Sequence, residues 1–130
     1  MSNVAPTTIL CIDDDPVALV ARSLVLSIAG YDVLTAPSGD AALRILSHRK
    51  IDLVITDDYL PGATGAEIAL SLKQLNPAIL VVLLTGGIEL PRGSEQADLV
   101  LVKGMSPDAF LTIMEKLLGE GAQPAADDLN

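Results

Sequence analysis

Carboxylates occur in two groups in this chain, each directly after a short apolar run. Asp13, Asp14 and Asp15 follow "TILCI", and Asp57 and Asp58 follow "DLVIT". Crowded carboxylates repel one another, and a hard divalent cation such as Mg²⁺ can offset that repulsion. Mg²⁺ bound by one or two carboxylates keeps positions free for phosphate oxygens. These residue types therefore point to metal-assisted phosphate chemistry.

Two other polar residues end later apolar runs. Thr85 closes "AILVVLLT" and Lys103 closes "DLVLVK". A hydroxyl and an ammonium can bind the remaining oxygens of a phosphoryl group and stabilise the charge that develops during its transfer. A lone threonine or lysine is more often structural or solvated, so this interpretation depends on all these groups meeting at one place.

The elements that must position these groups alternate between strands and helices. Short runs rich in β-branched residues and leucine predict strands at 8–12, 31–36, 52–56, 78–85 and 98–103. Segments with helical periodicity and capping signals predict helices over 16–30, 38–50, 64–77 and 106–119. This order predicts an α/β fold, a doubly wound five-stranded parallel sheet with helices on both faces. Sites in such sheets lie at the carboxyl ends of the strands, where the polar residues above would gather.

The length and charge of the chain limit what it can be. With 130 residues we expect one domain at 8–119, a short extension at 1–7, and a tail at 120–130 that is too polar to pack. No apolar run is long enough to span a bilayer, and the N-terminus does not read as a secretory signal, so we expect a cytoplasmic protein. The net charge of −9 disfavours nucleic acid and anionic membranes as partners.

Two other residues could in principle be reactive or bind a metal, but we expect both to be structural. Cys11, the single cysteine, lies inside the first apolar run and is expected to be a buried hydrophobic residue. His48 stands beside Arg49 and Lys50 at a predicted helix end, where cations suit the helix dipole. It has no second ligand at helical spacing, so we do not expect a metal site there.

Four segments in order, "ILCIDDDP", "DLVITDDYLPGATG", "LVVLLTGG" and "LVLVKG", resemble the receiver domain of two-component response regulators. The resemblance implies the flavodoxin-like, receiver-type version of the predicted fold, a Mg²⁺ cofactor, and a phosphoacceptor four residues before Pro61, which is Asp57. It also implies that Asp13 and Asp14 hold the metal, with Asp14 as a direct ligand.

The resemblance assigns the other positions of the site as well. Asp57 and the backbone carbonyl of Tyr59 complete the metal ligands, while Thr85 and Lys103 take the family's hydroxyl and lysine roles. Asp15 matches a position that is not a ligand, and we expect it to be a turn or cap residue before the first helix.

The family implies a function for the whole chain. The chain would be a stand-alone response regulator in a phosphorelay, accepting a phosphoryl group on Asp57 from the phosphohistidine of a sensor kinase or phosphotransfer protein. It would promote its own phosphorylation and dephosphorylation and would not be an enzyme acting on other substrates. The phosphorylated form would switch its interaction with a downstream protein.

The first helix suggests where such a partner would dock. We expect its core face to carry Val17, Val20, Leu24 and Ile28. This arrangement leaves Leu19, Arg22 and Leu26 facing outward as a candidate docking patch.

The chain departs from the family pattern between Thr85 and Lys103. This segment is short and contains "GGIELPRGSEQA", and because glycine and proline disfavour helices we expect the fourth helix to be shortened or missing. Val100 stands where the family often has a switching aromatic residue, and Gly104 stands where it usually has proline. An aromatic flip therefore cannot be the readout of this chain.

Two alternatives remain open. The chain could be a receiver-like interaction module that works without phosphorylation, because fold alone does not establish activity. "DDDPV" also satisfies the opening motif of haloacid-dehalogenase-like phosphatases, in which Asp13 would be the nucleophile and Asp15 the acid. That family needs its later acidic pair after the threonine and lysine, whereas here "TDD" precedes both.

Overall fold

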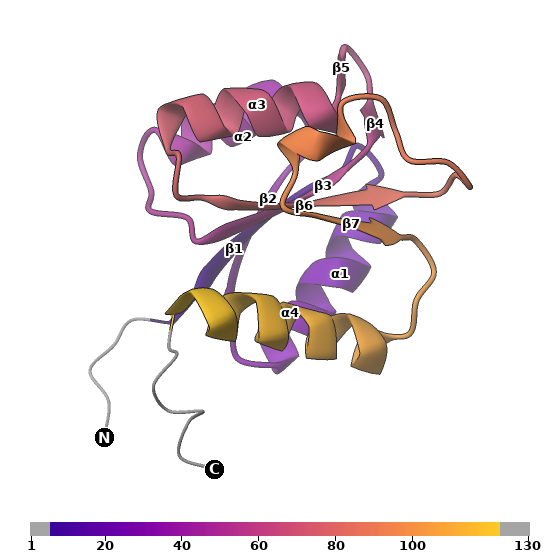
Figure 1. The fold of residues 1–130 in the computed structure, drawn as a ribbon. Coiled ribbons are helices and arrows are strands. Elements are labelled where there is room, and N and C mark those ends of the chain that lie inside the picture. The colour runs from indigo at the N-terminus through magenta and orange to yellow at the C-terminus, as the bar shows by residue number, and fades with distance from the viewer. Residues whose placement is uncertain (1–5, 123–130) are drawn as a thin grey trace.

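A parallel five-stranded sheet forms the centre of the molecule in this computed structural model, which describes residues 6–122 (Figure 1). The strands are β1 (Thr8–Ile12), β2 (Asp32–Ala36), β3 (Leu53–Asp57), β6 (Leu80–Thr85) and β7 (Leu99–Val102). Their order is β2-β1-β3-β6-β7, and every neighbouring pair is parallel. The predicted doubly wound sheet is confirmed.

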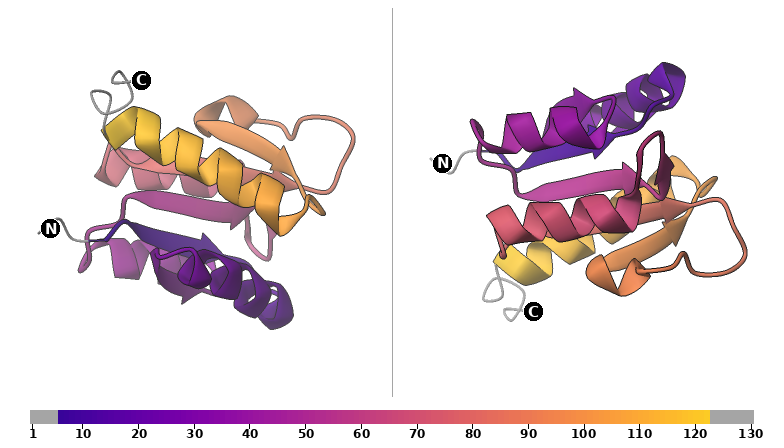
Figure 2. Two further views of the ribbon diagram at one scale, coloured as in Figure 1. Left: turned by 90° about the horizontal axis from the view of Figure 1, so that it is seen from below. Right: turned by 90° about the horizontal axis from the view of Figure 1, so that it is seen from above.

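Helices cover both faces of this sheet. They are α1 (Pro16–Ile28), α2 (Gly39–Leu46), α3 (Gly65–Leu75) and α4 (Pro107–Ala122). Figures 1 and 2 show α2 and α3 on one face and α1 and α4 on the other. Two hydrophobic clusters fill the space between the layers, with Leu10 and Val54 in the first and Ile9 and Ile55 in the second. Successive residues of β1 and β3 thus alternate between two cores, which is why runs such as 9–12 and 53–55 are apolar on both faces of the sheet.

The helices begin where the sequence signals predict. The Asp15 side chain accepts a hydrogen bond from the backbone N–H of Val17 at 3.0 Å, so Asp15 is the N-cap of α1. Ser38 caps α2 in the same manner. Thr64 and Glu67 form a reciprocal capping box at the start of α3, so the loop after β3 has a defined end.

The ends of the chain differ in part from expectation. Helix α4 continues to Ala122, three residues beyond the predicted domain end at 119. The rest of the predicted tail, 123–130, and most of the predicted extension, 1–5, lie outside the described residues. Over residues 6–122, no helix combines the length and apolar character needed to cross a bilayer.

Helix α1 is turned the other way from our prediction. Val17, Val20, Leu24 and Ile28, predicted to face the core, are 57 to 77% exposed. Leu19 and Leu26, predicted to face outward, are buried in the core, and Arg22 between them is half-buried. Both stripes are apolar at helical spacing, so the sequence pattern alone did not distinguish them. The patch of Leu19, Arg22 and Leu26 is therefore not a docking surface.

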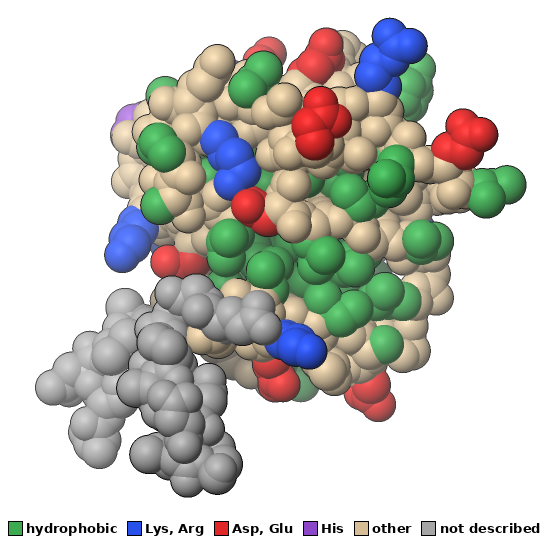
Figure 3. Space-filling view, viewed as in Figure 1, with side chains coloured by type: hydrophobic (Ala, Val, Ile, Leu, Met, Phe, Trp, Pro, Cys, Tyr) green, Lys and Arg blue, Asp and Glu red, His purple; other side chains and the backbone are tan. Residues whose placement is uncertain are grey.

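The connection between β6 and β7 is remodelled as predicted. Where an α-helix would otherwise link β6 to β7, the connection contains only a short 3₁₀ helix, η1 (Ser94–Gln96), and the helix labelled α4 follows β7. Asp98 fixes the end of this connection. Its Oδ2 accepts a hydrogen bond from the Val81 backbone N–H and forms an ion pair with Lys73 Nζ, both at 2.7 Å. Figure 3 shows apolar side chains gathered across the middle of this face, between η1 and α4. Ile88 is among the exposed apolar residues of the connection.

A two-stranded hairpin that the sequence did not suggest follows β3. It pairs β4 (Tyr59–Leu60) with β5 (Ala63–Thr64), and Gly62 in its turn has a φ of +85°, which favours glycine. The Gly65 backbone N–H then donates to the Asp58 carbonyl at 3.0 Å. The loop carrying Asp57 is therefore closed by backbone pairing at its base.

Gly65 is required by close packing at this base. A Cβ at Gly65 would overlap the backbone oxygen of Asp57 and the side chain of Leu83. We expect Gly65→Ala to lower the free energy of unfolding by about 1–3 kcal/mol, as overpacking does. Gly119→Ala is the matched control, since it adds a methyl group in open space within α4 and should be neutral or stabilising by up to about 1 kcal/mol. Urea unfolding of both variants measures this, and equal stabilities would contradict the packing argument.

Candidate functional site

Three of the predicted metal ligands meet at the carboxyl edge of the sheet. Asp13, Asp14 and Asp57 each offer an oxygen, and these oxygens lie within 4.8 Å of one another. Asp13 and Asp57 are buried, whereas Asp14 is exposed. Carboxylates from β1 and β3 converge because the two strands are adjacent and parallel, so their carboxyl ends lie side by side.

Asp57 ends β3 and carries a buried carboxylate oxygen in contact with a lysine. Its Oδ1 lies 2.7 Å from Lys103 Nζ as an ion pair. No other donor reaches this oxygen among residues 6–122, so the Lys103 ammonium is its partner there. The ammonium offsets the burial of this negative charge, and the oxygen keeps lone pairs for a further ligand.

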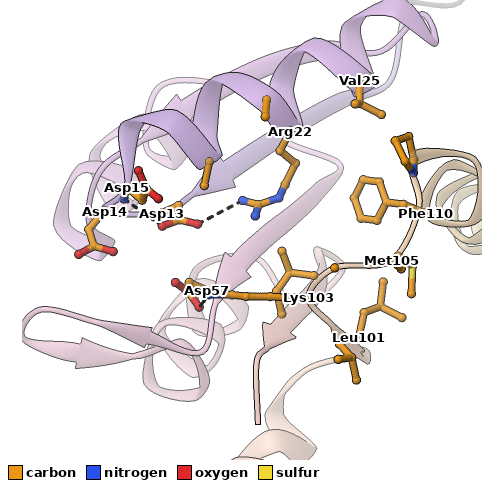
Figure 4. Close-up of a pocket in the computed structure, with 16 residues that line it drawn as sticks. Asp13, Asp14, Asp15, Arg22, Val25, Asp57, Leu101, Lys103, Met105 and Phe110 are labelled. Atoms are coloured by element: carbon orange, nitrogen blue, oxygen red, sulfur yellow. Dashed lines mark hydrogen bonds and ion pairs between the residues drawn. The ribbon is translucent and has the colours of Figure 1, made fainter.

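Asp13 is satisfied on both oxygens. Its Oδ1 accepts from the backbone N–H of Asp15 at 3.0 Å. Its Oδ2 lies 3.4 Å from Nη1 of Arg22, which reaches back from α1 (Figure 4). Sequence reasoning placed Arg22 on the outer surface of its helix and so missed this cation. Its nine-residue separation from Asp13 in sequence gave no signal for the contact.

Lys103 reaches the acidic cluster from the end of β7. Its backbone N–H donates to the Thr85 carbonyl at 2.8 Å, and its side chain extends to Asp57. Partial burial lowers the pKa of Lys103, but the contact with Asp57 and the negative charges of Asp57, Asp13 and Asp58 outweigh it, so the net shift is upward. Lys103 therefore remains charged.

Thr85 and the positions flanking the site show smaller features. Thr85 ends β6 and is buried, and its Oγ1 accepts from the Gly87 backbone N–H at 3.1 Å. Gly104 follows Lys103 with a φ of +94°, a conformation that proline cannot adopt. Tyr59 is 79% exposed on β4, and the use of its carbonyl as a ligand stays a prediction.

The residues present fit a hard divalent cation. The cluster supplies three carboxylates, and one of them has the buried oxygen with free lone pairs described above. Oxygen-only ligands with two or more acidic groups suit Mg²⁺ better than softer transition metals. Asp13, Asp14 and Asp57 would hold such an ion.

A cleft of about 450 Å³ opens from the acidic cluster along the groove between α1 and the segment after β7. Figure 4 shows its two parts. The carboxylates and Lys103 occupy one end, and apolar side chains, including Val25, Met105 and Phe110, line the other.

Two residues outside this cleft behave as the sequence predicted. Cys11 is fully buried, and desolvation raises its pKa to about 12, partly offset by the charge of Arg22. The thiol is therefore protonated and inert at neutral pH. His48 Nδ1 lies 2.9 Å from the Arg44 carbonyl just beyond the end of α2, so His48 is at the predicted helix end.

Comparison with known proteins yields consistent matches. A family model described as the response regulator receiver domain matches residues 9–115. The transcriptional regulatory protein GlrR of Escherichia coli K12 is 32% identical over 127 residues, which are 95% of this chain and 28% of GlrR. The chain thus spans less than a third of this relative's length.

Solved structures show the same fold. A CheY-like receiver domain protein from Methanospirillum hungatei JF-1 aligns with a TM-score of 0.84 at 25% identity, covering 90% of this chain and 97% of that one. The response regulator TrrA from Thermotoga maritima, solved in complex with Mg²⁺-BeF, aligns with a TM-score of 0.79 at 30% identity, covering 85% and 98%.

The Lys103–Asp57 ion pair has a measurable consequence. Asp57→Asn should lower the pKa of Lys103, because the contact with Asp57 is the largest influence that raises it. In the wild type, the stabilisation from this raised pKa is full below the unfolded-state pKa and disappears as the pH rises through the folded value. NMR titration of ¹³C-labelled lysine side chains measures the shift.

The control for this titration is Asp40→Asn, which removes an exposed carboxylate in the first turn of α2. It should leave the Lys103 titration unchanged. An identical Lys103 pKa in Asp57→Asn and the wild type would show that the two groups are not paired in solution.

Proposed function

This chain belongs to the response regulator receiver domain family, and on that premise we propose that it accepts a phosphoryl group on Asp57 in a two-component phosphorelay. The observation that carries the proposal is the buried Oδ1 of Asp57, in contact with Lys103 and surrounded by the other acids. An oxygen with free lone pairs at the edge of an open cleft can act as a nucleophile.

The proposed reaction transfers a phosphoryl group from a histidine of another protein to Asp57. A carboxylate oxygen of Asp57 attacks the phosphorus of a phosphohistidine, a new P–O bond forms, and the P–N bond to the histidine breaks. The electron pair of the broken bond returns to the imidazole. Hydrolysis of the resulting acyl phosphate by water restores Asp57 and releases inorganic phosphate.

Each side chain of the site has a proposed role in that reaction. Asp13, Asp14 and Asp57 would hold a Mg²⁺ ion, with the Tyr59 carbonyl as a further ligand. The ion would neutralise charge on the phosphoryl oxygens. Lys103 supplies a positive charge beside Asp57. Thr85 offers its hydroxyl proton, since its oxygen already accepts from Gly87. The complex of TrrA with Mg²⁺-BeF supports this assignment by similarity.

The corrected orientation of α1 moves the proposed docking surface. Val17, Val20, Leu24 and Ile28 form an exposed apolar stripe on α1, next to the loop that carries the acids. We assign docking of the kinase or phosphotransfer partner to this stripe. The excess of acidic over basic residues favours a partner with a basic rim.

The proposal covers this chain alone. GlrR is named a transcriptional regulatory protein, and the chain matches 28% of its length. From the net charge of −9 we still predict that these 130 residues do not themselves bind nucleic acid.

The central test is covalent phosphorylation by a small donor. Incubation with acetyl phosphate and Mg²⁺ should add the mass of one phosphoryl group, and chelation with EDTA should prevent it. Asp57→Asn should abolish the added mass. Asp58→Asn, which removes the neighbouring carboxylate, is the matched control and should be phosphorylated like the wild type. Intact-mass spectrometry reads all four samples.

The same experiment distinguishes the alternatives. A folded wild-type protein that gains no mass would favour the interaction module that works without phosphorylation. Added mass that survives in Asp57→Asn but disappears in Asp13→Asn would favour the phosphatase chemistry, in which Asp13 is the nucleophile.

A second test addresses docking. Val20→Asp combined with Leu24→Asp should reduce phosphotransfer from purified, autophosphorylated histidine kinases at least about tenfold, as charges in an apolar contact do. Phosphorylation by acetyl phosphate should be unaffected, because a small donor does not dock. Leu75→Asp, an exposed leucine at the end of α3, is the control. Unchanged phosphotransfer in the double variant would exclude the stripe.

A further inference from the structure

Arg22 is a cation at the acidic site that the proposed reaction does not use. It projects from α1 on the side that carries the buried Leu19 and Leu26, and its side chain is only 15% exposed. Figure 4 shows it extending from the helix toward Asp13, across the groove from Phe110. A guanidinium cannot lose its proton, so this charge is permanent.

Arg22 contacts the carboxylate of Asp13, which is also one of the residues that would bind the metal. Asp13 has a side chain that is 3% exposed, and its Oδ1 is already used by the Asp15 N–H. Its other oxygen, Oδ2, is the one that lies 3.4 Å from Arg22. Any cation held by the cluster therefore shares Asp13 with a positive charge provided by the protein.

We propose that Arg22 is a built-in counter-cation that competes with the divalent ion for Asp13 and thereby weakens Mg²⁺ binding. Without the ion, Arg22 and Lys103 together offset the repulsion among the acids. With the ion bound, Arg22 is an excess positive charge in a partly buried region, where charges are poorly screened. The inference rests on the proposed function, because it concerns the same metal.

The structure also provides a place for Arg22 to go. The cleft that it lines continues past Val25 toward Met105 and Phe110, and its volume of about 450 Å³ can accept the displaced side chain. The flat guanidinium face can pack against an aromatic ring such as Phe110. Release of Arg22 from Asp13 would then link occupation of the metal site to the groove between α1 and α4.

The opposite role for Arg22 makes the opposite prediction. If Arg22 served to orient Asp13 for the metal, its removal would weaken Mg²⁺ binding. If it competes, its removal must strengthen binding. The sign of the change in affinity therefore separates the two roles.

The test is isothermal titration calorimetry, in which the full chain is titrated with MgCl₂ in the absence of any phosphodonor. Arg22→Met keeps the apolar length of the side chain and removes its charge, and we expect a Kd for Mg²⁺ at least about fivefold lower than in the wild type. Arg22→Lys should keep an affinity close to the wild type, because it keeps the charge.

Arg49→Met is the matched control. It removes the same charge from an exposed ion pair with Asp32 at the start of β2, the opposite end of the strands from the acids. Its Kd should equal the wild-type value. Should Arg22→Met fail to fold, as judged by circular dichroism, Arg22→Gln removes the charge while keeping hydrogen-bond donors, and the same decrease in Kd is expected.

The outcomes distinguish this inference from the proposed function. An unchanged or higher Kd in the folded Arg22 variants, with wild-type protein that binds Mg²⁺, overturns the counter-cation role and leaves the phosphoacceptor proposal intact. Absence of Mg²⁺ binding in the wild type overturns both. A similar decrease in Kd for Arg49→Met would show a general effect of net charge and would also overturn the inference.

Discussion

Repulsion among carboxylates at one edge of the sheet is the constraint on which the rest of this structure depends. Asp13, Asp14 and Asp57 present oxygens within 4.8 Å of one another, and two of these residues are buried. Such a cluster is unfavourable unless cations are close. The protein supplies two from different elements, Lys103 after β7 and Arg22 in α1, and the buried oxygen of Asp57 keeps lone pairs for a further ligand.

The fold maintains this arrangement by fixing the first residue after each of the three strands that carry the site's charges. Beyond the end of β1, the Asp13 N–H donates to the Ala36 carbonyl at 3.2 Å. Beyond β3, the Asp58 N–H donates to Leu84, and beyond β7 the Lys103 N–H donates to Thr85. Each charged loop is thus tied to a neighbouring strand, so packing of the apolar strands provides the rigidity that a charged site needs.

The β6–β7 connection shows where the chain departs from a regular alternation of strands and helices. Only η1 lies there, and the connection is anchored by Asp98, which contacts both Lys73 and β6. Apolar side chains remain visible on this face (Figure 3). With Val100 at the aromatic position of the family and Gly104 after Lys103, any change that followed the proposed phosphorylation would act through a differently built surface.

The sequence by itself determined the order and type of the main elements, because strand composition, helix periodicity and caps such as Thr64 and Glu67 are local properties. It also indicated that the acids, Thr85 and Lys103 stand at the ends of four of the five strands, which parallel pairing then brings to one edge. The hairpin after β3 was not predicted, because its two-residue strands are too short to show a period.

Only the tertiary structure decided which face of α1 is buried. That helix carries two apolar stripes, so its periodicity fits either orientation, and packing on the sheet selects Leu19 and Leu26. The same rotation brings Arg22 to Asp13. The physical reason is that helical spacing alone fits either stripe, so the elements packed opposite α1 determine which one is buried, and here the sheet and the buried Asp13 lie opposite the stripe with Leu19, Arg22 and Leu26.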